Sequence, residues 1–126
     1  DGQLVVETPV VTGSHATGYD TPAGSVWAID AKKRDADFTL YTAHVTFWLP
    51  FNDQVGIHDS SWRTDYGGDI YLTSGSHGCI NTPYDAAEKI FNTVGIGDPV
   101  IVYYSLDDVV GPQPTQKNTQ DTAIAN

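Results

Sequence analysis

The sequence has few positive charges and no segment suited to crossing a membrane. Its 126 residues include 6 Lys and Arg against 16 Asp and Glu, which gives a net charge of −10. Attraction to a phosphate backbone needs the opposite sign, so the composition excludes nucleic acid as a partner. No apolar run approaches the roughly 20 residues that span a bilayer, and no basic segment followed by an apolar one opens the chain. We therefore expect one domain with its own core, and any anchor outside this chain.

Cysteine is almost absent too. Cys79 is the only one, which excludes a disulfide within the chain. It stands in the stretch GSHGCINTP, residues 75–83, two positions after His77. A lone cysteine is more often a small buried residue than a nucleophile. The glycines and the histidine around Cys79 favour the nucleophile, because such residues shape and activate a thiol site.

Helical periodicity is scarce in the first half of the chain. Between residues 4 and about 49, short runs of β-branched and aromatic residues alternate with turn residues, as is typical of strands. Residues 16–24 are predicted to form a loop, and bulky residues on both faces of 38–49 indicate a central strand region covered on two sides. Residues 51–76 are polar and rich in glycine, with two short apolar pieces, VGIH and DIYLT. We interpret this segment as a functional loop held by brief strands.

One helix is predicted, directly after the cysteine loop. Thr82 and Asp85 have capping-box spacing, and Pro83 suits the first helical position. Gly95 ends the pattern. The buried face is expected to comprise Tyr84, Ala87, Ile90, Phe91 and Val94. The apolar run DPVIVYYSL is then predicted as a central strand, and the polar residues after Val110 as a linker or disordered end.

Three features of the sequence favour a thiolate at Cys79. The helix predicted to follow it would present unpaired amides and a positive dipole end. Small Gly78 would let backbone amides approach a reacting carbonyl, as an oxyanion hole requires. His58 and His77 are both available as bases. Metal binding through His77, Cys79 and a further histidine is the alternative, and the lack of a cysteine pair or of a helically spaced histidine pair argues against zinc.

The order of these residues resembles the signature of the L,D-transpeptidase catalytic domain (YkuD-like) family. Seventeen residues separate His58 from the run SHGCIN at residues 76–81. Further stretches stand in family order: VVETPVVTG, TPAG, VTFWLPF, GIHDSSWR, YGGDIY and GDPVIVYY. The resemblance therefore covers about residues 3–104.

The resemblance implies a mainly β fold, with β-sandwich-like mixed sheets and one short helix after the cysteine loop. Residues 1–106 would form the catalytic domain and residues 107–126 a flexible tail. The implied enzyme is a peptidoglycan L,D-transpeptidase that works outside the cytoplasmic membrane, in the cell wall or on an anchor outside this chain. It would act as a monomer without cofactor or metal. Its partners would be peptidoglycan stem peptides and, as covalent inhibitors, β-lactams of the carbapenem type.

The implied reaction proceeds through a thioester on Cys79. The sulfur would attack the carbonyl between the third residue of a donor stem tetrapeptide and its terminal D-alanine, and D-alanine would leave. An amine of an acceptor stem would then take the acyl group. Water as the acceptor would make the enzyme an L,D-carboxypeptidase. A non-catalytic cell-wall-binding module is a further alternative, against which the complete signature argues.

The resemblance also assigns roles to individual residues. His58 matches the general base, and Asp59 would fix its tautomer through its side chain or its backbone carbonyl. His77 is expected to shape the pocket and to help stabilise the thiolate. The expected oxyanion donors are the amides of His77, Gly78 and Cys79. The residues expected to contact the substrate are Tyr41, Trp62, Ser76 and Asn81. The two aromatic ones have an alternative place in the core, where strand aromatics are more often found.

Chain order separates this family from other cysteine acyl-transfer enzymes. Papain-like and cell-wall endopeptidase domains place the cysteine before the histidine, whereas His58 and His77 both precede Cys79. In sortases an arginine follows the cysteine, whereas in this chain Arg34 and Arg63 both precede Cys79. Neither class fits this sequence.

Overall fold

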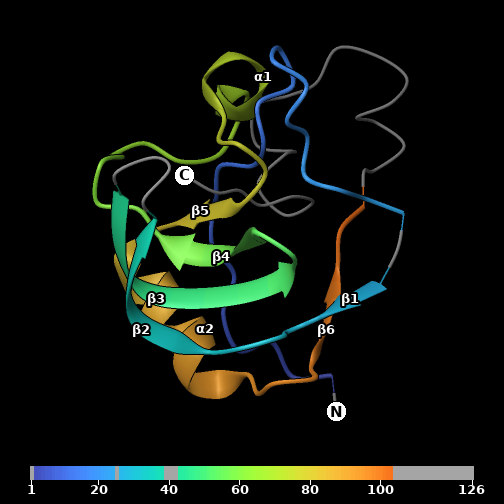
Figure 1. Cartoon of the computed structure of the whole chain (residues 1–126), viewed down its shortest axis with the longest axis vertical. Coiled ribbons are helices and arrows are strands. Elements are labelled where there is room, and N and C mark those ends of the chain that lie inside the picture. Colours follow the sequence, from blue (N-terminus) through green and yellow to red (C-terminus); the bar gives the residue numbers. More distant parts are fainter. Residues whose placement is uncertain (1, 25, 39–42, 104–126) are drawn as a thin grey trace.

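The described part of the chain folds into two small sheets and two helices (Figure 1). The computed structural model describes residues 2–24, 26–38 and 43–103. The elements in chain order are β1 (Val26–Ala28), β2 (Lys33–Phe38), β3 (Ala43–Asn52), β4 (Val55–Asp59), α1 (Ile70–Ser74), β5 (Ile80–Thr82), α2 (Tyr84–Thr93) and β6 (Pro99–Ile101). Antiparallel and parallel strand pairs both occur, so the predicted mainly β fold with mixed sheets is confirmed. Within these residues, neither helix is long and apolar enough to cross a membrane.

The larger sheet has the strand order β2-β3-β4-β5. Its first three strands are antiparallel neighbours, and β5 then joins β4 in parallel. Along β3, Val45, Phe47 and Leu49 are buried, and the residues between them are half-buried. The strand is central, as predicted, but only one of its faces is fully covered. This difference leaves Trp48 on the less covered face, which is also the face of the neighbouring His58.

The core lies between the larger sheet and α2 (Figure 1). The Phe47 ring of β3 meets the Phe91 ring of α2, with centroids 5.3 Å apart. Ala87 and Phe91 form the buried side of the helix, and Ile90 and Val94 pack against it while half-exposed. The predicted buried face of the helix is therefore confirmed at Ala87 and Phe91. Its first member, Tyr84, is 50% exposed.

The predicted capping box at the start of α2 was wrong. Thr82 belongs to β5, where it pairs with Asp59 across the parallel ladder. Its hydroxyl donates to the Ile80 carbonyl at 3.0 Å, and Pro83 caps the helix without a side-chain hydrogen bond. Strand pairing thus outcompetes local capping. As a result, a strand separates Cys79 from the helix that was expected to follow it directly.

Three other predicted strands also differ in the structure. The piece DIYLT forms the N-cap and most of helix α1, since a run of five residues is too short for periodicity to separate strand from helix. Among the described residues, the run from 98 to 106 yields β6, which pairs with β1 alone and is not central. Pro99 lacks the N–H of an inner strand residue. Residues 4–10 form no strand, and the run makes only isolated bridges, from Val11 to Asn81 and from Gly13 to Ser76. The predicted tail, 107–126, lies outside the described residues.

Candidate active site

Parallel pairing of β4 and β5 brings the predicted histidine and cysteine together. His58 pairs with Asn81 and Ile57 with Ile80. Cys79 directly precedes β5, so it lies one diagonal step from His58, on the order of 8 Å between Cα atoms at standard strand spacing. Paired residues of adjacent strands point to the same face of a sheet, so Asn81 shares the face of His58. The site is therefore built on two neighbouring strands.

The His58 ring is fixed in one tautomer by the backbone. It is fully buried, with 0% of its surface exposed, and its Nδ1 lies 2.6 Å from the Asp59 carbonyl oxygen. A carbonyl only accepts, so Nδ1 carries the hydrogen and Nε2 of the neutral ring is the basic nitrogen. Burial lowers the pKa of His58 to about 4, assisted by the charge of Arg63 and opposed by the contacts to Asp59. The ring is thus a neutral base at physiological pH.

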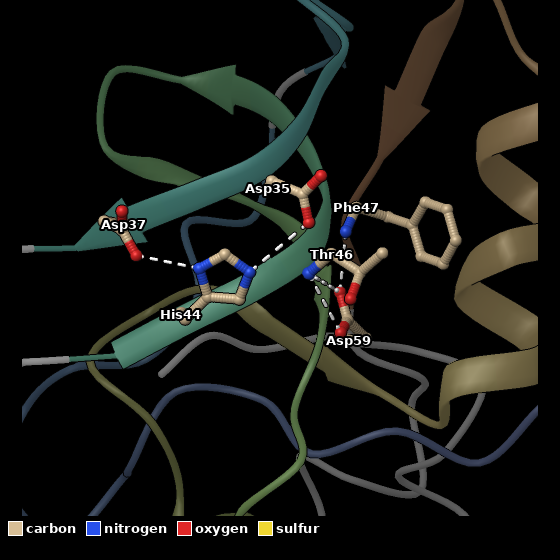
Figure 2. Close-up of polar contacts among 6 residues, drawn as sticks. All are labelled: Asp35, Asp37, His44, Thr46, Phe47 and Asp59. Carbon is tan, nitrogen blue, oxygen red and sulfur yellow. Dashed lines mark hydrogen bonds and ion pairs between the residues drawn. The ribbon is translucent and has the colours of Figure 1, made fainter.

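The carboxylate of Asp59 faces the backbone of β3 at Thr46 and Phe47 (Figure 2). Its Oδ1 accepts hydrogen bonds from the amides of Thr46 at 2.9 Å and Phe47 at 2.8 Å. These amides lie just beyond the last paired residue of the β3–β4 ladder, Trp48. The carboxylate therefore ties β4 to β3, and the contact from Asp59 to the imidazole comes from its backbone carbonyl.

The Cys79 thiol is buried beside the β3–β4 turn. Its side chain is 4% exposed, and Sγ donates to the Gln54 carbonyl at 3.0 Å. Burial raises the pKa of Cys79 to about 12, and a backbone hydrogen bond from Gly56 opposes this effect. The sequence-based expectation of a thiolate stabilised by a following helix was wrong for this state. The thiol is neutral because it is desolvated and because β5, rather than a helix, follows it.

Hydrogen bonds fix the backbone of the cysteine loop from inside. Gly78 has φ +123°, a conformation that favours glycine. Its carbonyl accepts from the Thr21 hydroxyl at 2.7 Å. The buried Ser76 hydroxyl donates to the Cys79 carbonyl at 2.8 Å and accepts from the Gly78 amide at 3.1 Å. Of the predicted residues, Ser76 and the Gly78 amide thus serve the loop itself in this state.

The remaining predicted residues occupy different surroundings. His77 is exposed, and its ring meets Tyr19 edge-on at 4.7 Å. Trp62 is 45% exposed, with its ring 5.8 Å from that of His58. Asn81 is 0% exposed, and its amide oxygen and nitrogen bond to no described residue. Tyr41 lies outside the described residues.

Two further aromatic residues at the site escaped the sequence analysis. The rings of Phe38 and Trp48 lie 5.3 and 5.7 Å from the His58 ring, measured between centroids. Trp48 pairs with His58 across the β3–β4 ladder. The strand register brings these two rings to His58, and a pattern in a single sequence does not determine that register. In the described segments, His, Cys, Asp and Glu side chains form no group of three that could hold a metal ion.

Known proteins similar to this chain are L,D-transpeptidases. A family model described as the L,D-transpeptidase catalytic domain matches residues 1–102. A cysteine-to-serine variant of an Enterococcus faecium L,D-transpeptidase has a similar structure, with a TM-score of 0.73, 41% identity, and coverage of 82% of this chain and 43% of that one. The chain thus spans less than half the length of this relative. No curated protein sequence matches.

Two more solved structures are similar. The catalytic domain of E. faecium L,D-transpeptidase acylated by ertapenem has a TM-score of 0.68 and 41% identity, covering 82% of this chain and 84% of that one. An L,D-transpeptidase from Mycobacterium tuberculosis H37Rv has a TM-score of 0.64 and 28% identity, covering 76% of this chain and 42% of that one. The residues matched by the family model, 1–102, include both sheets and the cysteine loop.

Proposed function

Because the chain belongs to the L,D-transpeptidase catalytic domain (YkuD-like) family, we propose that it joins peptidoglycan stem peptides through a thioester on Cys79. The observation that carries this proposal is the pairing of β4 with β5. It sets the cysteine loop beside a buried imidazole whose Nε2 is the basic nitrogen. Nucleophilic acyl transfer requires a thiol and a neutral, oriented base; here the thiol directly precedes β5 and the base lies on the neighbouring β4.

The proposed reaction has two acyl transfers. As Sγ of Cys79 attacks the carbonyl carbon before the terminal D-alanine, Nε2 of His58 takes the thiol proton. Amides of the cysteine loop, including that of Cys79, hold the oxyanion. The carbon–nitrogen bond breaks, the imidazolium returns the proton to the leaving D-alanine amine, and a thioester remains. The acceptor amine then attacks the thioester and gives a proton to His58, which reprotonates the departing sulfur.

Cys79 and His58 are both neutral in the resting protein, and this predicts an unusual pH dependence of the reaction rate. Since the pKa of His58 is lowered to about 4, the basic form is present above that pH and is lost below it. The kcat/KM for a stem tetrapeptide should therefore stay constant from about pH 8 down to about pH 5, and fall roughly tenfold per pH unit below about 4. Release of D-alanine is the measurement, with circular dichroism to show that the protein stays folded. An acid limb near pH 6.5 would identify a solvated histidine as the base and contradict the assignment.

We propose that Asn81 contributes to the acylation reaction and that its buried side-chain amide lowers the stability of the resting fold. An amide that is buried without partners destabilises the folded state by about 1–3 kcal/mol. The nearly isosteric change Asn81→Leu should therefore leave the melting temperature unchanged or raise it, while lowering the acylation rate by about tenfold or more. Calorimetry measures the melting temperature and a time course of acylation measures the rate, so the two expectations are checked separately. An unchanged rate would show that Asn81 plays no part in the chemistry.

The partners and location follow from the proposed substrate. Stem peptides of peptidoglycan lie outside the cytoplasmic membrane, so we propose an extracytoplasmic protein held in the wall or by a segment outside this chain. Acylation of the E. faecium relative by ertapenem supports carbapenems as covalent inhibitors of this chain. The proposed working form is a monomer without cofactor.

Incubation with a stem tetrapeptide and an amine acceptor tests the proposed function. Mass spectrometry should show release of D-alanine and a cross-linked product that joins the third donor residue to the acceptor amine. A tripeptide without cross-links would identify an L,D-carboxypeptidase. An unchanged tetrapeptide in the presence of folded protein would favour a wall-binding module.

A further inference from the structure

Two aromatic side chains, one from β2 and one from β3, contact the His58 imidazole. Phe38 closes β2, and its ring meets the His58 ring at 5.3 Å and 63°. Trp48 of β3 meets the same ring at 5.7 Å and 51°. The two rings also contact each other, edge-on at 4.8 Å. We call Phe38 and Trp48 the aromatic wall.

We propose that the aromatic wall is a positioning element for His58, which sets the orientation of the imidazole and keeps water from it. This inference rests on the proposed function, in which His58 accepts the thiol proton. Neither Phe38 nor Trp48 belongs to the signature around Cys79. Both act on the reaction only through the imidazole.

The close approach of Trp48 to β4 depends on Gly56. A Cβ atom at Gly56 would lie 2.8 Å from Cζ3 of Trp48 and 2.5 Å from the Leu49 carbonyl oxygen. Real Cβ atoms do not approach so closely, so only glycine allows the indole to lie against the strand two residues before His58. The register pair of Trp48 with His58 then holds both rings on one face of the sheet. The wall is thus fixed by the backbone of the site.

A third ring that contacts the imidazole is more exposed than the two wall residues. Trp62 contacts it at 5.8 Å and is itself 45% exposed. His58 itself is 0% exposed, and the two wall rings form part of its apolar cover. Apolar cover of this kind disfavours the charged form of a histidine, in agreement with burial as the largest cause of the lowered pKa of His58.

Charged neighbours account for less of this effect than burial does. The charges that act on His58 are those of Asp59, which favours protonation, and Arg63, which opposes it. On β5, the uncharged Asn81 pairs with His58, and the neutral Cys79 thiol stands directly before the strand. On the β2–β3 hairpin, Asp37 and Asp35 are paired with His44, at 2.8 and 3.4 Å (Figure 2). The wall residues themselves carry no charge, so replacing them changes solvation and orientation rather than local charge.

The change Phe38→Ala tests the wall, because Phe38 is half-buried at a strand end and its loss is compatible with folding. We expect this change to raise the pKa of His58 by about one unit, read from the imidazole resonances in an NMR titration without substrate. The acid limb of kcat/KM for D-alanine release should move up by the same amount. Phe38→Tyr keeps the ring and should restore both values. Tyr84→Ala, which removes an aromatic ring that contacts Phe47 and not His58, should change neither.

A folded Phe38→Ala protein with an unchanged His58 pKa and an unchanged acid limb would overturn the inference. Trp48→Leu provides a second route if the first variant fails to fold, with the same expected direction. The proposed function is tested separately by the wild-type protein. If that protein releases no D-alanine, the proposed function fails, while the NMR titration still decides whether the wall controls protonation of His58.

Discussion

Replacing the sulfur nucleophile is expected to remove the activity altogether. In the variant Cys79→Ala, release of D-alanine from a stem tetrapeptide should fall by about 10⁴-fold or more, because no other group can form the thioester. Cys79 is the only cysteine, so no second thiol can substitute for it. Chromatography of the tetrapeptide digest, with detection of free D-alanine, measures the loss.

Two comparisons keep this result interpretable. Cys79 is buried, so alanine leaves a small cavity, and the melting temperature of the variant must be recorded. Cys79→Ser keeps the size of the side chain and the hydrogen-bonding group, and it should be as inactive as the alanine variant since a hydroxyl is a much weaker nucleophile. Turnover retained by either folded variant would show that the reaction does not proceed through this sulfur.

The second large effect concerns which histidine is the base. His58→Gln should slow acylation of Cys79 by about 10²- to 10⁴-fold, the usual contribution of a positioned general base. His77→Ala should slow it by only a few-fold, although His77 stands two residues from the cysteine. His58 is buried and held by the Asp59 carbonyl, whereas His77 is exposed and packed against Tyr19.

The rate of adduct formation with a carbapenem measures this difference without needing an acceptor. Glutamine retains a donor for the Asp59 carbonyl, so the comparison isolates the loss of the basic nitrogen. The double variant, with both His58→Gln and His77→Ala, should be slower than His58→Gln alone only by the few-fold effect expected of His77→Ala. A greater loss from His77→Ala than from His58→Gln would reverse the assignment of the base.

The sequence was sufficient for the family and the fold class. A single cysteine inside the run 76–81, with an upstream histidine at a fixed spacing, is a specific signal. The strand character of residues 26–28 and 43–49 was also visible, as was the buried side of α2. These features depend on local pattern, which a sequence carries directly.

The features that were missed depend on contacts between distant segments. Thr82 has the local pattern of a helix cap, yet pairing with Asp59 makes it a strand residue. The same pairing places β5 after Cys79, so the thiol is desolvated where a helix dipole was expected to ionise it. Likewise, Phe38 and Trp48 reach His58 only through the register of the sheet. Register and desolvation are tertiary properties, and they decide the protonation states of the site.

Intact-protein mass spectrometry after incubation with a carbapenem tests the central claim, that Cys79 becomes the acylated residue. The protein should gain the mass of one inhibitor molecule per chain, and peptide mapping should place the adduct on the fragment that contains Cys79. His58→Gln should give the same adduct far more slowly. A folded protein that gains no mass, or one whose adduct maps to a different side chain, would contradict the account.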